Sequence, residues 1–202
     1  MSAATITPPS QLDILEAAAA PWADLETLFG TRGACGGCWC MAWRCKRRDY
    51  ETGKGELKRE RLKTLWRSGR PVGLLGYWQG RPVAWCSVAP RSDFAYFETT
   101  RSLKPIDALP AWAISCLFVA ADQRRQGLAR QMVVAAADHA FRQGAPVLEA
   151  YPVSGSGATV APVFIWTGVP ALYEPAGFRP AQAARSTGGR TLYRLWPENA
   201  RG

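Results

Sequence analysis

The feature that most constrains the fold is an apolar run that leads through a basic turn into a helix. The run AWAISCLFVA (Ala111–Ala120) is almost without polar residues, which is typical of a strand buried on both faces. The turn ADQRRQG follows, and beyond Gly127 the residues Leu128, Met132 and Ala136 recur at helical spacing. A buried strand that leads directly into an amphipathic helix predicts an α/β fold with a mixed sheet.

Turn residues and apolar spacing predict the remaining elements. Helices are expected at PWADLETLFG (residues 21–30), at CWCMAWRCKRR (38–48), as one amphipathic helix over 46–63, and in a short segment that ends at Gly177. Strands are expected at FAYFETT (94–100), PVLEAYPV (146–153) and TLYRLW (191–196), with a hairpin around Gln79-Gly80-Arg81. The segment SGSGATVAP (154–162) is expected to be a loop.

Length and charge limit the function classes. We expect the 202 residues to form one domain, 1–202, with a helical part over 1–70 and a core over 71–196. The formal net charge is +9, but much of it is interleaved with acids in 46–63 and no nucleic-acid-binding motif accompanies it. Neither a signal peptide nor a membrane-spanning run is visible, so we expect a cytoplasmic protein with no membrane partner. A homodimer is compatible with these features.

The basic turn has the chemistry of an anion site. The first N–H groups of a helix have no intrahelical partner and carry the positive end of the helix dipole. Gly127 would let a phosphate approach the backbone, Ala129 keeps the next turn small, and Arg124 and Arg125 add positive charge. An ordinary turn with solvent-facing arginines has the same sequence. The pattern is neither a Walker P-loop nor the three-glycine dinucleotide fingerprint.

The pattern Arg124-x-x-Gly127-x-Ala129 after SCLFVAAD resembles the signature of the GNAT superfamily of acyl-CoA-dependent N-acetyltransferases. The later segment ALYEPAGF (Ala171–Phe178) resembles a second motif of that family, and CWCMAWR, WCSVAPR and EAYPV resemble a bacterial subgroup of it. The resemblance covers nearly the whole chain. It implies the GNAT-type acyl-CoA N-acyltransferase fold, a central mixed β-sheet flanked by helices.

The resemblance also implies a site for acetyl-CoA as co-substrate. In that family the cofactor lies in a split between two parallel strands, and its pantetheine arm pairs with the strand before the turn. This implies cofactor contacts from the strand residues Leu117, Phe118 and Val119. The pyrophosphate would lie on the turn, formed here by Arg124, Arg125, Gln126, Gly127, Leu128, Ala129 and Arg130.

Acetyl transfer to an amine needs a proton acceptor, a stabilised oxyanion and a proton for the leaving thiolate. Tyr173 matches the tyrosine that protonates the CoA sulfur in many family members, although it could instead pack on the sheet. The resemblance implies that a backbone N–H near Phe118 or Val119 stabilises the oxyanion. For the base, Glu149 and Glu98 are candidates, each with the alternative of an ordinary salt-bridged residue.

Two further groups of residues have competing interpretations. His139, the only histidine, falls in a predicted helix beside Asp138 and is interpreted as structural. The cysteines at 35, 38, 40 and 45 could bind zinc, but they crowd into eleven residues among tryptophans, whereas zinc ribbons use two separated pairs. We therefore expect no metal and interpret these cysteines as reduced thiols beside the acceptor pocket.

The predicted function is the transfer of an acetyl group from acetyl-CoA to the amine of a small molecule, by direct attack in a ternary complex. The nine tryptophans, several of them in the N-terminal third, fit an aromatic-walled pocket for a small amine and fit equally well a role in the core. Two alternatives stay open at this point: a protein or peptide N-acetyltransferase, and an acyl-CoA-binding sensor without catalytic activity.

Overall fold

The computed structural model describes residues 11–53, 55–153, 165–181 and 189–199 of the chain. A seven-stranded sheet in the order β1-β2-β3-β4-β5-β7-β6 forms its centre. The strands are β1 (Asp13–Glu16), β2 (Leu74–Trp78), β3 (Arg81–Pro90), β4 (Trp112–Val119), β5 (Leu148–Ala150), β6 (Arg179–Pro180) and β7 (Tyr193–Leu195). The α-helices are α1 (Trp22–Phe29), α2 (Arg47–Thr52), α3 (Gly55–Arg67), α4 (Ala95–Thr99), α5 (Leu128–Arg142) and α6 (Pro170–Tyr173).

The sheet is mixed, as the sequence predicted. Strands β4 and β5 run parallel, and every other neighbouring pair is antiparallel. The parallel pairing is short: it covers Trp112–Ile114 of β4 against Leu148–Ala150 of β5. On its other side β4 pairs with β3 along its whole length. The carboxyl half of β4 therefore lacks a neighbouring strand on the β5 side within the described residues.

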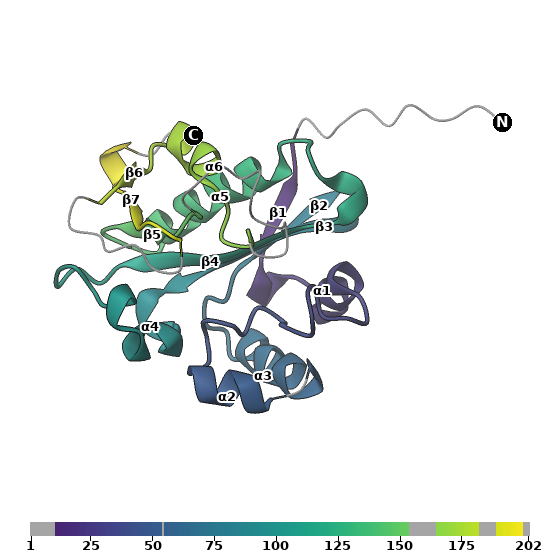
Figure 1. Ribbon diagram of the computed structural model, residues 1–202. Helices are drawn as coiled ribbons and strands as arrows, with labels where there is room; N and C mark the ends of the chain where they lie inside the picture. Colours follow the sequence, from purple (N-terminus) through teal and green to yellow (C-terminus); the bar gives the residue numbers. More distant parts are fainter. Residues whose placement is uncertain (1–10, 54, 154–164, 182–188, 200–202) are drawn as a thin grey trace.

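Helices cover both faces of the sheet (Figure 1). Helix α5 lies on one face with α6, whereas α1, α2 and α3 lie on the other. Side chains that alternate along a strand divide between the two layers: Leu74 and Cys86 pack in the core cluster that holds α5, and Leu75 and Trp85 pack in the cluster that holds α1 and α3. Residues next to each other on β4 consequently face different helical layers.

Several predicted elements are confirmed. The hairpin turns at Gln79 and Gly80, whose φ values of 50° and 75° both lie in the left-handed region, as a type I′ turn requires. Helix α1 ends before Gly30, and Gly144, with a φ of 80°, follows the end of α5. The strands at 146–153 and 191–196 and the short helical segment that ends at Gly177 are also present.

Four expectations about local structure were wrong. Residues 38–45 form turns instead of a helix, and helix α2 begins only at Arg47. The charged segment 46–63 is not one helix, because the chain becomes extended at Gly53 between α2 and α3. FAYFETT forms the helix α4 instead of a strand. Residues 13–16, where no strand was expected, pair with β2 as the edge strand β1. The loop expected at 154–162 lies outside the described residues.

Within the described ranges, no helix combines the length and the apolar character that crossing a membrane requires.

Candidate active site

The divergence of β4 from β5 creates the candidate site. The first half of β4 is buried, whereas Cys116, Leu117, Phe118 and Val119 are partly exposed. The apolar composition of β4 had suggested that it is buried on both faces along its whole length. The structure shows such burial only for its first half. The N–H of Leu117 donates to the carbonyl of Trp166 at 2.8 Å, so a peptide from the segment before α6 occupies this part of the strand edge.

The turn after β4 has the backbone geometry of a helix start that can accept an anion. Gly127 is the N-cap of α5 and has a φ of 79°. Arg125 also lies in the left-handed region, with a φ of 65°. The Nε of Arg124 donates to the carbonyl of Val119 at 3.1 Å and fixes the turn against the end of β4. The first N–H groups of α5 point out of its amino end, where a phosphate could accept them.

A cavity of about 460 Å³ lies beside the exposed half of β4. It brings together four residues that the sequence assigned to the cofactor, namely Leu117, Phe118, Val119 and Arg124. Its other walls come from Ala34 and Cys35, and from Ile165 and Trp166. The strand residues and the first arginine of the turn therefore line one continuous space.

The other predicted turn residues do not line that cavity. Gly127 and Arg130 border a separate hollow of about 540 Å³, together with residues of the β1 region and Pro175. The side chain of Leu128 is 1% exposed and belongs to the core, so only its backbone can face a ligand. Arg125 is exposed, and Gln126 and Ala129 are partly exposed at the same turn.

A second cavity, of about 320 Å³, adjoins the first and is predominantly apolar. The two cavities share lining residues from three segments, which are Ala34, Cys35, Leu117, Phe118 and Trp166. We call this second space the thiol pocket, because four cysteines line it. Its lining comprises Ala34, Cys35, Cys38, Cys40, Ala42, Trp43, Tyr50, Ser115, Cys116, Leu117, Phe118 and Trp166. No carboxylate, lysine or arginine occurs among these residues.

Tyr173 is completely buried in the core cluster that holds α5 and lines neither of these two cavities. Its hydroxyl donates to the carbonyl of Thr167 at 2.8 Å. Burial, with a further contribution from the nearby thiols of Cys86 and Cys116, raises the pKa of this phenol well above its ordinary value. Two successive carbonyls are therefore bound: that of Trp166 accepts from β4, and that of Thr167 accepts from Tyr173.

Glu149 lies in a buried network of charges at the paired end of β4 and β5. Its side chain is 1% exposed, and its two oxygens accept hydrogen bonds from Arg91 at 3.1 Å and from Arg194 at 2.8 Å. The hydroxyl of Tyr151 donates to the same carboxylate at 2.6 Å. Glu149 does not line the thiol pocket. Glu98, the other candidate base, is exposed and lies 4.0 Å from Arg91.

The cysteines of the N-terminal segment are not arranged as one ligand set. The sulfur of Cys40 lies 3.2 Å from that of Cys116 on β4, whereas Cys45 accepts a hydrogen bond from Arg61 at 3.6 Å. Burial raises the pKa of the Cys38 thiol, which also lines the pocket. In the described part of the chain, no three His, Cys, Asp or Glu side chains are placed to hold a metal ion. That the thiols are free of metal stays a prediction.

His139 lies on α5 away from both cavities. It is 2% exposed, and its Nδ1 lies 3.0 Å from the carboxylate of Glu16 at the end of β1. Burial lowers the pKa of the imidazole, while the nearby Glu16 opposes that shift. The contact ties β1 to α5.

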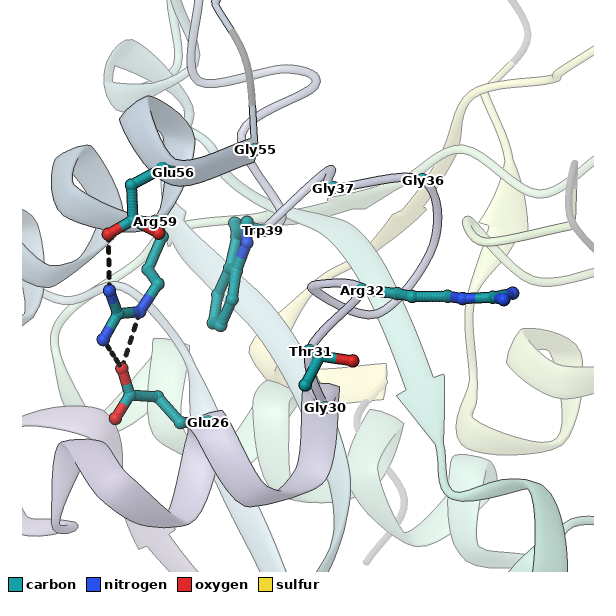
Figure 2. Close-up of a pocket in the computed structure, with 10 residues that line it drawn as sticks. All are labelled: Glu26, Gly30, Thr31, Arg32, Gly36, Gly37, Trp39, Gly55, Glu56 and Arg59. Atoms are coloured by element: carbon teal, nitrogen blue, oxygen red, sulfur yellow. Dashed lines mark hydrogen bonds and ion pairs between the residues drawn. The ribbon is translucent and has the colours of Figure 1, made fainter.

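A third cavity, of about 570 Å³, lies between the end of α1, the loop at 30–37 and the start of α3 (Figure 2). Arg59 bridges Glu26 and Glu56, each at 2.5 Å, and the Trp39 ring lies beside this group. Arg32 points away from them. The charges of Arg59 and the two glutamates are paired with one another. The cavity shares no lining residue with the thiol pocket or with the cavity beside β4.

Sequence reasoning missed several residues of the thiol pocket. Trp166, Tyr50 and Ser115 each line it, although they belong to three separate segments. Ser115 stood in a run assigned to a buried strand, and nothing in the sequence distinguished its two faces. The only available signal was that Trp166 stands a few residues before the ALYEPAGF segment, which resembles a family motif.

The parallel strands that diverge beside a glycine-bearing helix start have the arrangement of an acyl-CoA-dependent acyltransferase. The family model described as "Acetyltransferase (GNAT) family" matches residues 38–156, which is more than half of the chain. The chain belongs to this family. It is therefore an acyltransferase with acetyl-CoA as co-substrate. Curated protein sequences give no significant match.

Solved structures share the fold at low sequence identity. Ribosomal-protein-alanine N-acetyltransferase from Brucella melitensis is 22% identical, with a TM-score of 0.54, over 92% of this chain and 99% of that one. AAC(6')-Ib in complex with paromomycin and acetyl-CoA is 15% identical, with a TM-score of 0.57, over 94% and 96%. YncA, a putative acetyltransferase from Salmonella typhimurium solved with acetyl-CoA, is 16% identical, with a TM-score of 0.52, over 96% and 98%. These likenesses establish the fold and leave the acceptor open.

Proposed function

We propose that this protein transfers the acetyl group of acetyl-CoA to the amine of a small, apolar molecule bound in the thiol pocket. The observation that carries the proposal is the continuity of two cavities along the exposed half of β4. Leu117 and Phe118 line both, so a thioester that lies along this strand edge would face an acceptor in the thiol pocket.

The cofactor would bind along Leu117–Val119, with its phosphates at the turn that Arg124 opens. The N–H of Leu117 is already bonded to Trp166, so the pantetheine arm and the Trp166 carbonyl compete for one donor. Cofactor binding at Leu117 would therefore displace the peptide before α6. The Tyr173 hydroxyl donates a hydrogen bond to the Thr167 carbonyl in the same segment. Displacing that segment would therefore also free the hydroxyl to face the departing sulfur.

The acceptor class follows from the lining of the thiol pocket. A cationic amine entering it would lose its hydration without meeting a carboxylate among the residues that line the pocket, and an unpaired buried charge is costly. The pocket therefore favours an amine that is neutral near pH 7 and carries an apolar or aromatic group. A polycationic acceptor would need acidic side chains that this lining lacks.

The catalytic groups fit this acceptor. A neutral amine can attack the thioester and then release its proton to water, so no strong base is required in the pocket. We propose Tyr173 as the acid for the CoA thiolate and a backbone N–H near Phe118 or Val119 for the oxyanion. Glu149 as the base stays a prediction of the sequence, and its two arginine partners weigh against it, because they occupy the lone pairs that a base must offer.

The proposal is tested by filling the pocket. Ala42 is partly exposed and lines the thiol pocket, so Ala42→Phe would occupy space that the acceptor needs. We expect KM for the best amine to rise about tenfold or more, with acetyl-CoA affinity unchanged, when CoA release is followed over a panel of amines. The control is Ala23→Leu on the exposed face of α1. Equal kinetics for Ala42→Phe and wild type would show that the acceptor binds elsewhere, as a peptide in an open groove would.

A further inference from the structure

Two cysteines from distant parts of the chain meet at the wall of the thiol pocket. The sulfur of Cys40, in the N-terminal segment, lies 3.2 Å from the sulfur of Cys116 on β4, 76 residues later. Both side chains line the pocket. A disulfide has an S–S length of about 2.05 Å, so the two sulfurs need to approach by little more than about 1 Å to bond.

The sulfur of Cys40 has a hydrogen-bond donor and a buried cation in its surroundings. The indole N–H of Trp85 donates to this sulfur at 3.1 Å. The guanidinium of Arg44 is buried nearby and interacts electrostatically with Cys40, although its own burial lowers the pKa of Arg44 to about 10. In contrast, the hydrogen bond to Cys40 and the burial of the thiol raise the pKa of Cys116 well above its ordinary value. Negative charge that develops on an attacking sulfur is better stabilised at Cys40, which accepts the Trp85 hydrogen bond, so Cys40 is the attacking sulfur of the pair.

The backbone that presents Cys40 is strained. Trp39 and Cys40 have φ values of 44° and 47°, which place two consecutive residues with side chains in the left-handed region. That conformation is unfavourable for residues that carry a Cβ and persists where the surrounding structure enforces it. Here Trp39 packs in the core cluster between α1 and α3, and this packing fixes the direction of the Cys40 thiol.

We propose that Cys40 and Cys116 form an oxidation site that reacts with small, uncharged disulfides to give an internal disulfide bond. Cys40 gives up its proton as its sulfur attacks one sulfur of the reagent. A mixed disulfide forms, the S–S bond of the reagent breaks, and the first released thiolate takes that proton. Cys116 then attacks the Cys40 sulfur, forms the Cys40–Cys116 bond and displaces the second reagent thiolate, which takes the Cys116 proton. The protein loses two electrons and two protons, and the reagent is reduced to two thiols.

Cys35, Cys45 and Cys86 lack this arrangement. Cys86 is completely buried and does not line the pocket, and Cys45 contacts Arg61. Cys35 lines the pocket and is exposed, so a reagent that reaches the pocket also reaches Cys35. Cys35 is therefore the matched control: it has the same access without the paired sulfur. The proposal concerns the two thiols alone and does not depend on acetyl transfer.

The test treats the full-length protein with hydroxyethyl disulfide, blocks the remaining thiols and maps the cysteine peptides by mass spectrometry. In wild type and in Cys35→Ser we expect one cross-linked peptide pair that contains Cys40 and Cys116. In Cys116→Ser the second step is impossible, so the reagent should remain on Cys40 as a mixed disulfide, at least about tenfold more abundant than in wild type.

The proposal is overturned if wild type retains the reagent on Cys40, if the cross-link joins any other pair, or if Cys35 is modified while Cys40 and Cys116 both stay reduced. Cys40→Ser gives an independent reading in case the first variant does not fold. Without Cys40, the free Cys116 thiol should be lost at least about tenfold more slowly in the presence of the reagent than in wild type, and an unchanged rate of loss would contradict the assigned order of attack.

Discussion

Replacing Glu149 with glutamine separates a structural role of this residue from a catalytic one. Glutamine has nearly the same shape but removes the charge that faces Arg91 and Arg194. These two side chains are only 8% and 4% exposed, so water cannot replace the lost partner. Removing one member of a buried ion pair typically costs about 3–5 kcal/mol. Arg194 keeps its ion pair with Asp107, so we expect the lower end of that range, about 3 kcal/mol.

That loss is measurable as a change in melting temperature. In a domain of this length, 1 kcal/mol corresponds to about 2–4 °C, so Glu149→Gln should melt about 6–12 °C below wild type. Measured well below the melting transition, kcat on the best amine should stay within about twofold of wild type. A catalytic base would instead contribute about 10²-fold or more. Glu98→Gln, which alters an exposed carboxylate next to the same arginine, is the matched control and should change stability by less than about 0.5 kcal/mol.

Two results would refute this reasoning. An unchanged melting temperature in Glu149→Gln would show that the buried network contributes little to stability. A normal melting temperature together with a hundredfold loss of kcat would identify Glu149 as the base.

Three further predictions concern the turn, the acid and the histidine. Gly127→Glu should weaken acetyl-CoA binding, measured by calorimetry, about tenfold more than Gly127→Ala. Both variants strain the positive φ, but only glutamate repels phosphates. Equal losses of affinity would show that the phosphates do not bind at this turn. Tyr173→Phe should lower kcat at least about tenfold with acetyl-CoA affinity preserved, and a wild-type rate would make Tyr173 a packing residue. Burial lowers the pKa of His139 in the folded state, so the unfolded chain takes up the proton first as the pH falls below about 6.5. Urea unfolding should therefore show stability lost toward about pH 5 in wild type and a smaller loss in His139→Gln, and identical pH dependence would exclude this contribution.

The sequence predicted elements whose signals are local. The strand–turn–helix unit at 111–144 combines a long apolar run, a glycine in the left-handed region and an amphipathic helix, and each of these acts within a few residues. The hairpin at Gln79-Gly80 is specified in the same way by two residues that tolerate positive φ. These elements position β4 and the turn, and that this strand and turn bind the cofactor stays a prediction.

The segments that were mispredicted depend on distant contacts. In FAYFETT, Phe94 and Phe97 are both completely buried and stand three residues apart, which fits a helix although the composition favours a strand. In residues 38–45, Trp39 packs with α1 and α3, whereas Trp43 packs in a different cluster against Tyr151. No regular element could serve both clusters. Strand β1 has mostly exposed side chains and is specified by its pairing with β2.

The thiol pocket could not be predicted because its walls come from segments far apart in the chain. Cys40 and Cys116 meet only because the turns at 38–45 fold against β4, and Trp166 joins them from the segment before α6. The four N-terminal cysteines looked like one group in the sequence. In the structure, the sulfur of Cys40 contacts that of Cys116, which lies outside that group.

The central claim is that acetyl-CoA and an apolar, neutral amine meet along the exposed half of β4. Its most direct test is release of CoA thiol by the wild-type protein over a panel of primary amines matched in size, in which amine pKa and apolar character vary independently. We expect the highest kcat/KM for weakly basic aromatic or apolar amines, and a rise in kcat/KM with pH up to the pKa of each amine. Highest activity toward polycationic amines or peptide amino termini, or no acetyl-CoA turnover with any amine of the panel, would contradict it.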